Sequence, residues 1–330
     1  MKKKGTGVGS MWFGIGNTGL PNPAAAFVEV HHDLSATVLT GCADIGQGSS
    51  TVLAQIVAET LGLNFEKVKV TAADTGVTPE SGATSASRQT YVSGNACQKA
   101  AEMAKKTLLR VASSMLGAEE EEVSIEAEHA FLKEAPENAV TMVELLQECS
   151  NRGILVVGSG YFNPQITSLN PENMEGTPYA TYAFATQVVE IEVDTETGEV
   201  NVLKVVAVHD VGKAINPEQV EGQIEGGSIM GCSFALLEEL EVKEGIIQNA
   251  NLSRYLISTS KDVPRVYPVI VEDHEPTGPF GAKGVGEPAL IPTAPAILNA
   301  FYNATGVRIY ELPLTQEKVI EKLQEAGNLL

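Results

Sequence analysis

The chain contains 330 residues, 43% of them hydrophobic, and its mean hydropathy is close to zero. This balance is typical of a folded protein with two or three domains or subdomains and excludes a largely disordered chain. Acidic residues outnumber basic ones 42 to 22, giving a formal charge of −20, which disfavours sequence-independent binding to nucleic acid or to an anionic membrane.

The first half of the chain shows strand and helix patterns after a glycine-rich opening. Two apolar or alternating runs separated by a short polar turn predict a β-hairpin. A Ser-Ser-Thr cap and a terminal Gly62 bound the first helix. The predicted strands are 25–31, 36–41 and 66–72, and the predicted helices are 49–62 and 90–116.

The stretch from 118 to 180 is less regular, and we expect a domain boundary in it. Beyond it, a turn around Gly198 joins two long apolar strands into a second hairpin. Pro217 suits the first position of a helix. The predicted strands are 182–194 and 199–209, and the predicted helices are 141–150, 217–239, 293–305 and 315–324.

Hairpins and helices grouped in this way predict an α+β fold with two layered subdomains, not an alternating parallel βαβ fold. We assign the first subdomain to residues 1–165. The second, which carries the glutamate loop described next, is assigned to residues 166–330.

One carboxylate, Glu287, lies in a glycine-rich segment, residues 278–288. Glycines at 281, 284 and 286 allow positive φ angles and a close approach of the backbone to a ligand, so we expect the acid to be held against a buried partner. Glu287 is therefore the best candidate for a catalytic base. A solvated acid in a glycine-rich turn is the alternative, and the local pattern does not decide between the two.

Four glycine-containing segments join a loop to a helix, where backbone N–H groups are available to an anion. Each one alone is more often a structural turn, but four in one chain favour a large, phosphate-bearing cofactor. A P-loop is excluded because its Gly-Lys-Ser/Thr is absent, and a dinucleotide fingerprint because no predicted strand precedes Gly5. The segments are Gly46–Gly48, Gly82–Gln89, Gln219 with Gly222, and Gly281–Glu287.

The four cysteines stand far apart, and the five histidines show no metal-ligand spacing. Neither a zinc site nor an Fe–S cluster is therefore predicted, and the thiols are expected to be reduced and structural. The basic start of the chain is not followed by the apolar core of a signal peptide, and no run approaches the ~18 apolar residues of a membrane span. A cytoplasmic location is expected.

Four motifs occur in an order and at a spacing too specific for a chance match. On them, the chain resembles the molybdopterin-binding C-terminal half of the xanthine dehydrogenase and aldehyde oxidase family of molybdenum hydroxylases, over essentially its whole length. The motifs are Gly41–Gly48, Ser85–Arg88, Asp210–Gly222 and Gly284–Pro288.

The resemblance implies roles for the matching residues. Glu287 matches the general base beside molybdenum, and Gln219 matches a glutamine that contacts the cofactor. The metal is held by molybdopterin and by no protein side chain. The other residues that match cofactor-binding positions are Gly46, Gln47, Gly48, Ala83, Thr84, Ser85, Ala86, Ser87, Arg88, Gly222, Lys283, Gly284, Val285 and Gly286.

The resemblance also implies the composition of the enzyme. The chain looks like the medium subunit of a split enzyme, similar to that of nicotinate dehydrogenase from anaerobes. A large molybdopterin subunit would complete the site, a small subunit would carry two [2Fe-2S] clusters, and another would bind FAD. The implied cofactor is molybdopterin cytosine dinucleotide with a terminal sulfido or selenido ligand, and its pyrophosphate suits the Ser85–Arg88 loop.

The implied reaction is hydroxylation of a ring carbon next to nitrogen in a small N-heterocycle, with oxygen from water and NAD or NADP as the final acceptor. Phe13, Asn17 and Thr18 match a substrate-pocket segment. Asn17 stands where xanthine-oxidising relatives often carry an aromatic residue, so a purine pocket cannot be assumed. The likeness to nicotinate dehydrogenase favours nicotinate, while a purine and an aldehyde stay open. The alternative from another class is a non-catalytic, cofactor-holding assembly subunit.

Overall fold

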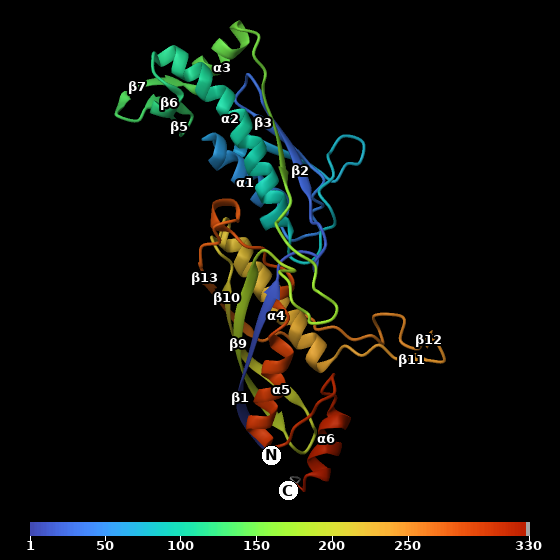
Figure 1. The fold of residues 1–330 in the computed structure, drawn as a ribbon. Helices are drawn as coiled ribbons and strands as arrows, with labels where there is room; N and C mark the ends of the chain where they lie inside the picture. Colours follow the sequence, from blue (N-terminus) through green and yellow to red (C-terminus); the bar gives the residue numbers. More distant parts are fainter. Residues whose placement is uncertain (328–330) are drawn as a thin grey trace. The chain divides into compact units, whose positions relative to one another are not determined.

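The computed structural model describes residues 1–327 and has the predicted α+β class (Figure 1). The chain forms two compact units. The Glu287 unit consists of Met1–Phe13, Tyr182–Asp273 and Val285–Leu330, and the Arg88 unit consists of Gly14–Thr181 and His274–Gly284. The predicted domains, 1–165 and 166–330, are continuous segments of the chain, whereas each observed unit combines segments that are distant in sequence. The first strand instead lies beside a strand of the second half of the chain.

The Arg88 unit is built on a four-stranded sheet in the order β4-β3-β2-β8, with β2 and β3 forming the predicted hairpin. Helix α2 packs on this sheet (Figure 1) because Gly158 and Gly160 leave room for it. A Cβ at either glycine would lie 2.0 Å from a carbonyl oxygen of the helix. The elements are β2 (Ala24–Val30), β3 (Ala36–Thr40), α1 (Ser49–Leu61), η1 (Phe65–Lys67), β4 (Val68–Ala72), η2 (Gln89–Ser93), α2 (Gly94–Leu116) and β8 (Val156–Phe162).

The remainder of this unit is a small three-stranded sheet with a helix that packs on it. Thr141 and Glu144 cap that helix reciprocally, as a capping box does. A further short helical turn precedes the segment that leads to Glu287. The elements are η3 (Glu120–Glu122), β5 (Val123–Glu126), β6 (His129–Leu132), β7 (Ala135–Thr141), α3 (Met142–Asn151) and η4 (Pro279–Gly281).

The Glu287 unit is built on a four-stranded sheet in the order β1-β9-β10-β13, in which β9 pairs with β10 antiparallel and β10 with β13 parallel. Helices α4 and α5 pack on it, and the core lies between them and the sheet. The elements are β1 (Lys2–Gly14), β9 (Tyr182–Asp194), β10 (Val200–Asp210), α4 (Pro217–Leu236), β11 (Val242–Lys243), β12 (Ile246–Ile247), β13 (Arg265–Val271), η5 (Glu287–Ala289), α5 (Thr293–Thr305) and α6 (Gln316–Glu325).

Both predicted hairpins and all the predicted helices are confirmed, although the helix that begins at Pro217 ends at Leu236 and not at 239. The sequence patterns missed the strands β1, β8 and β13, the small sheet β5-β6-β7 and the two-stranded sheet β11-β12. Within residues 1–327, no helix combines the length and the apolar character that crossing a membrane requires.

Candidate functional site

Glu287 opens the 3-10 turn η5. Three backbone hydrogen bonds close the turn, from Ala289 N to the Gly286 oxygen at 3.2 Å and from Leu290 N and Ile291 N to the Glu287 oxygen at 3.0 and 3.4 Å. Pro288 and Ala289 are buried, whereas the Glu287 side chain is exposed. The backbone of the turn is therefore held in the core of its unit while the carboxylate remains accessible.

The glycines before Glu287 serve a different purpose from the one expected. Only Gly281 takes a positive φ, 86°, while Gly286 has φ −141°. Gly284 is needed for space, because a Cβ on it would lie 1.6 Å from the carbonyl oxygen of Ser87. The expectation of positive φ at all three glycines was wrong, but the close approach of backbone to backbone is present at Gly284.

Helix α4 presents a buried acceptor and open space at its N-terminal end. Asn216 caps the helix by accepting from Gln219 N at 3.1 Å. The side-chain oxygen of Gln219 is buried and has no hydrogen-bond partner among the described residues. A Cβ on Gly222 or Gly226 would meet nothing within 4 Å. An unsatisfied acceptor beside open space fits a ligand that carries N–H donors.

The N-terminus of α1 in the Arg88 unit already holds an anion from the chain itself. The Asp44 carboxylate accepts from the N–H groups of Gly46 at 2.9 Å, Gly48 at 3.3 Å and Ser50 at 3.0 Å. Burial raises the pKa of Asp44 and is the largest single influence, but these bonds together outweigh it and lower the pKa. The amides that the sequence suggested were available to a ligand are therefore occupied by Asp44, a residue that the sequence analysis missed.

The Gln47 side chain makes its hydrogen bonds to other residues of the same loop. Its side-chain oxygen accepts from Ile45 N at 2.6 Å, and its nitrogen donates to the Ala43 carbonyl at 3.2 Å and to Ser49 Oγ at 3.0 Å. Thr84 Oγ1 donates to the same Ala43 carbonyl at 2.7 Å. The structure thus brings the Gln47 loop and the Ala83–Arg88 loop together.

The Ala83–Arg88 loop contains two consecutive left-handed residues that are not glycine, Ala86 with φ 51° and Ser87 with φ 53°. The strained conformation is held by tertiary contacts, since Gly16 N donates to the Ala86 oxygen at 3.0 Å and Gly284 packs on the Ser87 oxygen. Backbone strain that the surroundings enforce is concentrated at functional sites. This loop is the strongest structural candidate for ligand contact in the Arg88 unit.

Arg88 itself does not direct its charge outward. The side chain is 1% exposed, and its terminal nitrogens donate to four backbone carbonyls at 2.6 to 3.1 Å. Burial lowers the pKa of the guanidinium. The buried Arg88 side chain therefore holds the loop backbone in place through these carbonyls. Contact with a bound group would come from the other residues of the loop. The carbonyls belong to Ser81, Ala83, Asn22 and Pro23.

Lys283 is buried, and its positive charge acts on Glu275 in the same unit. Burial raises the pKa of Glu275 and is the largest single influence, but hydrogen bonds from Thr181 and Thr277 and the charge of Lys283 together lower it. The interactions of Glu275 with Lys283, Thr181 and Thr277 hold the segment that precedes Gly284 in place.

The three predicted substrate residues divide between the units, with Phe13 in the Glu287 unit and Asn17 and Thr18 in the Arg88 unit. Asn17 is held by Asn22, whose side chain accepts from Asn17 N at 2.8 Å and donates to its carbonyl at 3.3 Å. Thr18 hydrogen-bonds to the hydroxyl of Tyr179. The backbone around Asn17 is therefore rigid, and its side chain is half-buried.

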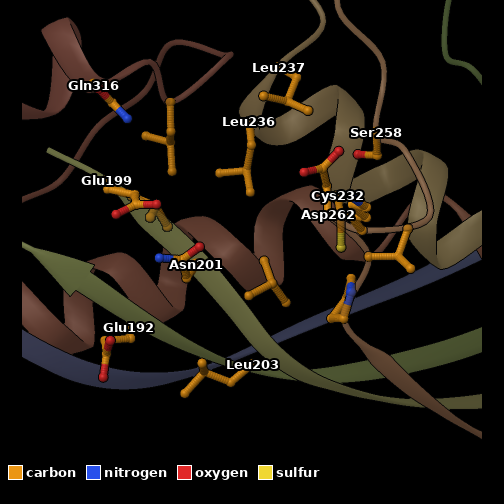
Figure 2. Close-up of a pocket in the computed structure, with 16 residues that line it drawn as sticks. Glu192, Glu199, Asn201, Leu203, Cys232, Leu236, Leu237, Ser258, Asp262 and Gln316 are labelled. Atoms are coloured by element: carbon orange, nitrogen blue, oxygen red, sulfur yellow. The ribbon is translucent and has the colours of Figure 1, made fainter.

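A pocket of about 560 Å³ lies in the Glu287 unit, but it includes none of the predicted site residues. Figure 2 shows residues that line it, which come from β9, β10, the end of α4, the loop before β13 and the start of α6. Burial raises the pKa of the lining Cys232 thiol to about 12, so this thiol is not a nucleophile at neutral pH. Among residues 1–327, no three His, Cys, Asp or Glu side chains are arranged to hold a metal ion.

Comparison with known proteins identifies the family. A sequence profile described as the molybdopterin cofactor-binding domain matches residues 1–264. The chain belongs to the molybdopterin cofactor-binding domain family. It is 35% identical over 307 residues to the putative xanthine dehydrogenase molybdenum-binding subunit XdhA of Escherichia coli, an alignment that covers 92% of this chain and 40% of that protein.

Other members of the family are similar over nearly all of the chain. The 6-hydroxypseudooxynicotine dehydrogenase complex subunit gamma of Paenarthrobacter nicotinovorans is 30% identical over 98% of this chain and 40% of its own length. The structure of quinoline 2-oxidoreductase from Pseudomonas putida matches with a TM-score of 0.89 and 27% identity, over 98% of this chain and 42% of that one. The chain thus spans about two fifths of the length of these relatives.

Proposed function

We propose that the chain is the medium, molybdopterin-binding subunit of a molybdenum hydroxylase and that Glu287 is its general base. The match of residues 1–264 to the molybdopterin cofactor-binding family carries the first part of this proposal. Glu287 lies outside those residues, and its role rests on the glycine-rich motif that contains it. The relatives are more than twice as long as the matched region, which supports a large molybdopterin subunit as the chain that completes the site. A small subunit with two [2Fe-2S] clusters and an FAD subunit would connect it to NAD or NADP.

The proposed cofactor is molybdopterin cytosine dinucleotide with a terminal sulfido or selenido ligand. When bound, it supplies the redox chemistry that hydroxylation with water requires. The unpartnered oxygen of Gln219 supports this class of ligand, since a pterin offers N–H donors, and the open space at Gly222 would admit a flat ring system. The other proposed cofactor contacts are Gly46, Gln47, Gly48, Ala83, Thr84, Ser85, Ala86, Ser87, Lys283, Gly284, Val285 and Gly286. Arg88, which the motif also placed at the cofactor, is buried and would hold the loop without contacting it.

The arrangement of donors refines where an anionic part of the cofactor would bind. Because Asp44 already occupies the amides at the start of α1, a pyrophosphate is better matched to the Ser85–Arg88 loop. Arg88 would act there by holding the strained backbone in place, not by pairing directly with phosphate. Gln47 would support the loop through the shared Ala43 carbonyl.

Glu287 would accept, at a carboxylate oxygen, the proton that water loses as its oxygen is transferred to the substrate carbon. A positioned general base of this kind typically contributes ~10² to 10⁴ in rate. The fixed backbone of the turn supports this role, because Pro288 and Ala289, which follow Glu287, are buried.

For the substrate, we favour an N-heterocycle and, within that class, the conversion of nicotinate to 6-hydroxynicotinate. The names of the relatives include a xanthine dehydrogenase, a 6-hydroxypseudooxynicotine dehydrogenase and an aldehyde oxidoreductase, so xanthine or another purine is the second candidate. Phe13, Asn17 and Thr18 would form this chain's part of the substrate pocket. Asn17 offers an amide in place of an aromatic ring.

The test is to purify the chain with its natural partner subunits, to assay molybdenum, selenium and flavin, and to measure turnover with nicotinate, hypoxanthine, xanthine and an aldehyde. We expect Glu287→Gln to retain molybdenum and all subunits but to lose at least ~10²-fold in turnover. Glu317→Gln is the matched control, because Glu317 is also an exposed acid in the first helical turn of an element of the same unit.

The second candidate function is a non-catalytic, cofactor-holding subunit, and the exposure of Glu287 favours it. Under this alternative, Glu287→Gln would retain both molybdenum and near-normal turnover, and the proposed role of Glu287 would be wrong. Loss of molybdenum with loss of activity would instead assign Glu287 to cofactor retention.

A further inference from the structure

A buried polar cluster lies directly beneath the turn that carries Glu287. At its centre is Gln187 of β9, which is 0% exposed. Its side-chain nitrogen lies 2.9 Å from the carbonyl oxygen of Ala289, the last residue of η5, and 3.1 Å from Ser228 Oγ of α4. Its side-chain oxygen accepts from Thr293 Oγ1 at 2.7 Å. One carboxamide thus links strand β9 to the Glu287 turn and to the two helices beside it.

Hydrogen bonds at both the nitrogen and the oxygen of the Gln187 carboxamide fix its orientation. The Ala289 carbonyl can only accept, so the group facing it must be the nitrogen. The nitrogen has two N–H groups but three acceptors within reach, the third being His209 Nε2 at 3.3 Å. A buried amide with this many partners can occupy only one rotamer, since every other orientation would leave donors or acceptors unpaired.

His209 keeps the cluster free of net charge. The ring is 1% exposed, and burial lowers its pKa to about 4, so it is neutral at pH 7. Because the Gln187 nitrogen donates, His209 Nε2 is the accepting atom, at the longest of the three distances, and the proton is assigned to Nδ1. Nδ1 is buried and has no hydrogen-bond partner among the described residues, so His209 is the one member of the cluster that is not fully paired. The polar groups beneath the turn are therefore dipoles in fixed directions, with no ionised side chain among those that bond to Gln187.

Helix α4 also constrains the Glu287 turn through close packing at two of its glycines. A Cβ on Gly227 would lie 2.4 Å from Ala289 Cβ, and one on Gly231 would lie 2.4 Å from Thr293 Cβ. The helix backbone therefore packs directly against Ala289 and Thr293, both of which are 0% exposed. Since Ala289 is only two residues from Glu287 and belongs to the same hydrogen-bonded turn, a constraint on Ala289 is transmitted to the Cα of Glu287.

We propose that Gln187 is a positioning residue, which sets the direction of the Glu287 carboxylate by anchoring the Ala289 carbonyl. This inference rests on the proposed function of Glu287 as the base. A buried leucine would fill the same volume without a directional bond, so the carboxamide contributes a defined geometry more than it contributes packing. Displacing a catalytic group by about 1 Å can cost ~10²-fold in rate, which gives such an anchor a kinetic effect.

The first measurement uses the full chain without cofactor. Hydrogen exchange is followed at the amides of Ala289, Leu290 and Ile291, whose hydrogen bonds close the turn. We expect Gln187→Leu to accelerate exchange at these amides about tenfold, while β10 and α5 keep their protection. Uniform acceleration over the whole unit, or no change at the turn, would overturn the proposal.

The matched control is Asn249→Leu. Asn249 is also a buried carboxamide of the Glu287 unit, and it makes two backbone hydrogen bonds, from its nitrogen to the Glu239 carbonyl at 2.6 Å and from Glu241 N to its oxygen at 3.0 Å. It makes no contact with η5 in the described hydrogen bonds. The control is expected to leave exchange at the turn unchanged, and equal acceleration in both variants would contradict a specific role for Gln187.

The second measurement uses the assembled holoenzyme with its substrate. Gln187→Leu is expected to lower kcat about tenfold or more while KM and molybdenum content change less than about twofold, since binding is kept and only the base is misplaced. Glu287→Gln is measured in parallel. If Glu287→Gln retains turnover, the proposed function fails. If Glu287→Gln is inactive but Gln187→Leu keeps its kcat, the positioning role alone fails.

Discussion

Arg88 and Asp44 show how charged residues of a binding motif are used inside this chain. Both occur in segments that suggest contact with a phosphate-bearing ligand, yet Arg88 donates to four carbonyls and Asp44 accepts from three amides of its own loop. Each charge is paired with backbone dipoles, although Arg88 Nε is buried and has no hydrogen-bond partner among the described residues. The residues that a ligand would meet are therefore those whose backbone these two side chains hold.

His209 provides a pH-dependent test of the buried cluster at the scale of one residue. Its pKa falls from 6.5 to about 4 on burial, so the unfolded chain binds more protons than the folded chain between these values. The stability that the neutral, buried His209 contributes is therefore fully present above pH 6.5 and is lost as the pH falls towards 4. By linkage, this group should cost about 2 kcal/mol between pH 7.5 and pH 5.

Urea unfolding followed by the fluorescence of Trp12 measures this effect, because Trp12 is the single tryptophan and packs on Tyr182 in the same unit as His209. His209→Gln is expected to lose that part of the acid destabilisation. His32→Gln replaces an exposed histidine and should leave the pH dependence as it is. An unchanged pH dependence in His209→Gln would show that the ring is not buried in its neutral form.

At the scale of elements, the glycines of β8 determine how closely α2 can pack on the sheet. A Cβ at Gly160 would lie 2.0 Å from the carbonyl oxygen of Ala96 and 2.5 Å from Ala100 N. Backbone atoms of a long helix cannot move aside cheaply, so we expect Gly160→Ala to lower the free energy of unfolding by about 2 to 3 kcal/mol.

Circular dichroism during urea unfolding is the measurement for this packing contact. Ser159→Ala is the neighbouring control, since Ser159 is exposed and its substitution is expected to change stability by less than about 0.5 kcal/mol. If Gly160→Ala were as stable as the control, a side chain on β8 would not restrict how closely α2 packs. The reason given for the glycine would then be wrong.

The same glycines explain which elements the sequence could predict. Helices with clear end signals, such as α3 behind Thr141 and α1 before Gly62, were found with nearly correct bounds. Strand β8 was missed because Gly158 and Gly160 weaken a strand pattern. In β1, Gly5, Gly7 and Gly9 belong to the glycine-rich opening, for which no strand was predicted, although their alternation was the available signal of a strand face packed on α5.

The proposed site residues stay a prediction, and the structure bears only on their backbone. Short motifs drew attention to the Glu287 turn and the Ala83–Arg88 loop, where the structure shows a close backbone approach at Gly284 and left-handed residues at Ala86 and Ser87. Gln187 lies in an apolar strand without any motif, and its partners come from segments distant in sequence, among them Ser228 and Thr293. Its role depends on tertiary structure alone, so no local pattern could have identified it.

At the scale of the whole molecule, the formal charge of −20 predicts how stability responds to salt. A large net charge destabilises the compact state by self-repulsion. The ion pairs include exposed pairs such as Lys204 with Glu190, whose nitrogen and oxygen are 3.0 Å apart, and pairs of this kind contribute at most about 1 kcal/mol each. Repulsion should therefore exceed attraction among the surface charges.

Raising NaCl from about 10 to about 150 mM shortens the screening length from about 30 to about 8 Å. At pH 7.5 we expect this to raise the urea midpoint, with a gain in stability on the order of 1 kcal/mol. The gain should be smaller at pH 5.5, closer to the isoelectric point of about 4.6, because fewer like charges remain to be screened. A midpoint that falls with salt at pH 7.5 would mean that the ion pairs outweigh the net charge, and the acidic surface would then stabilise this chain through its pairings.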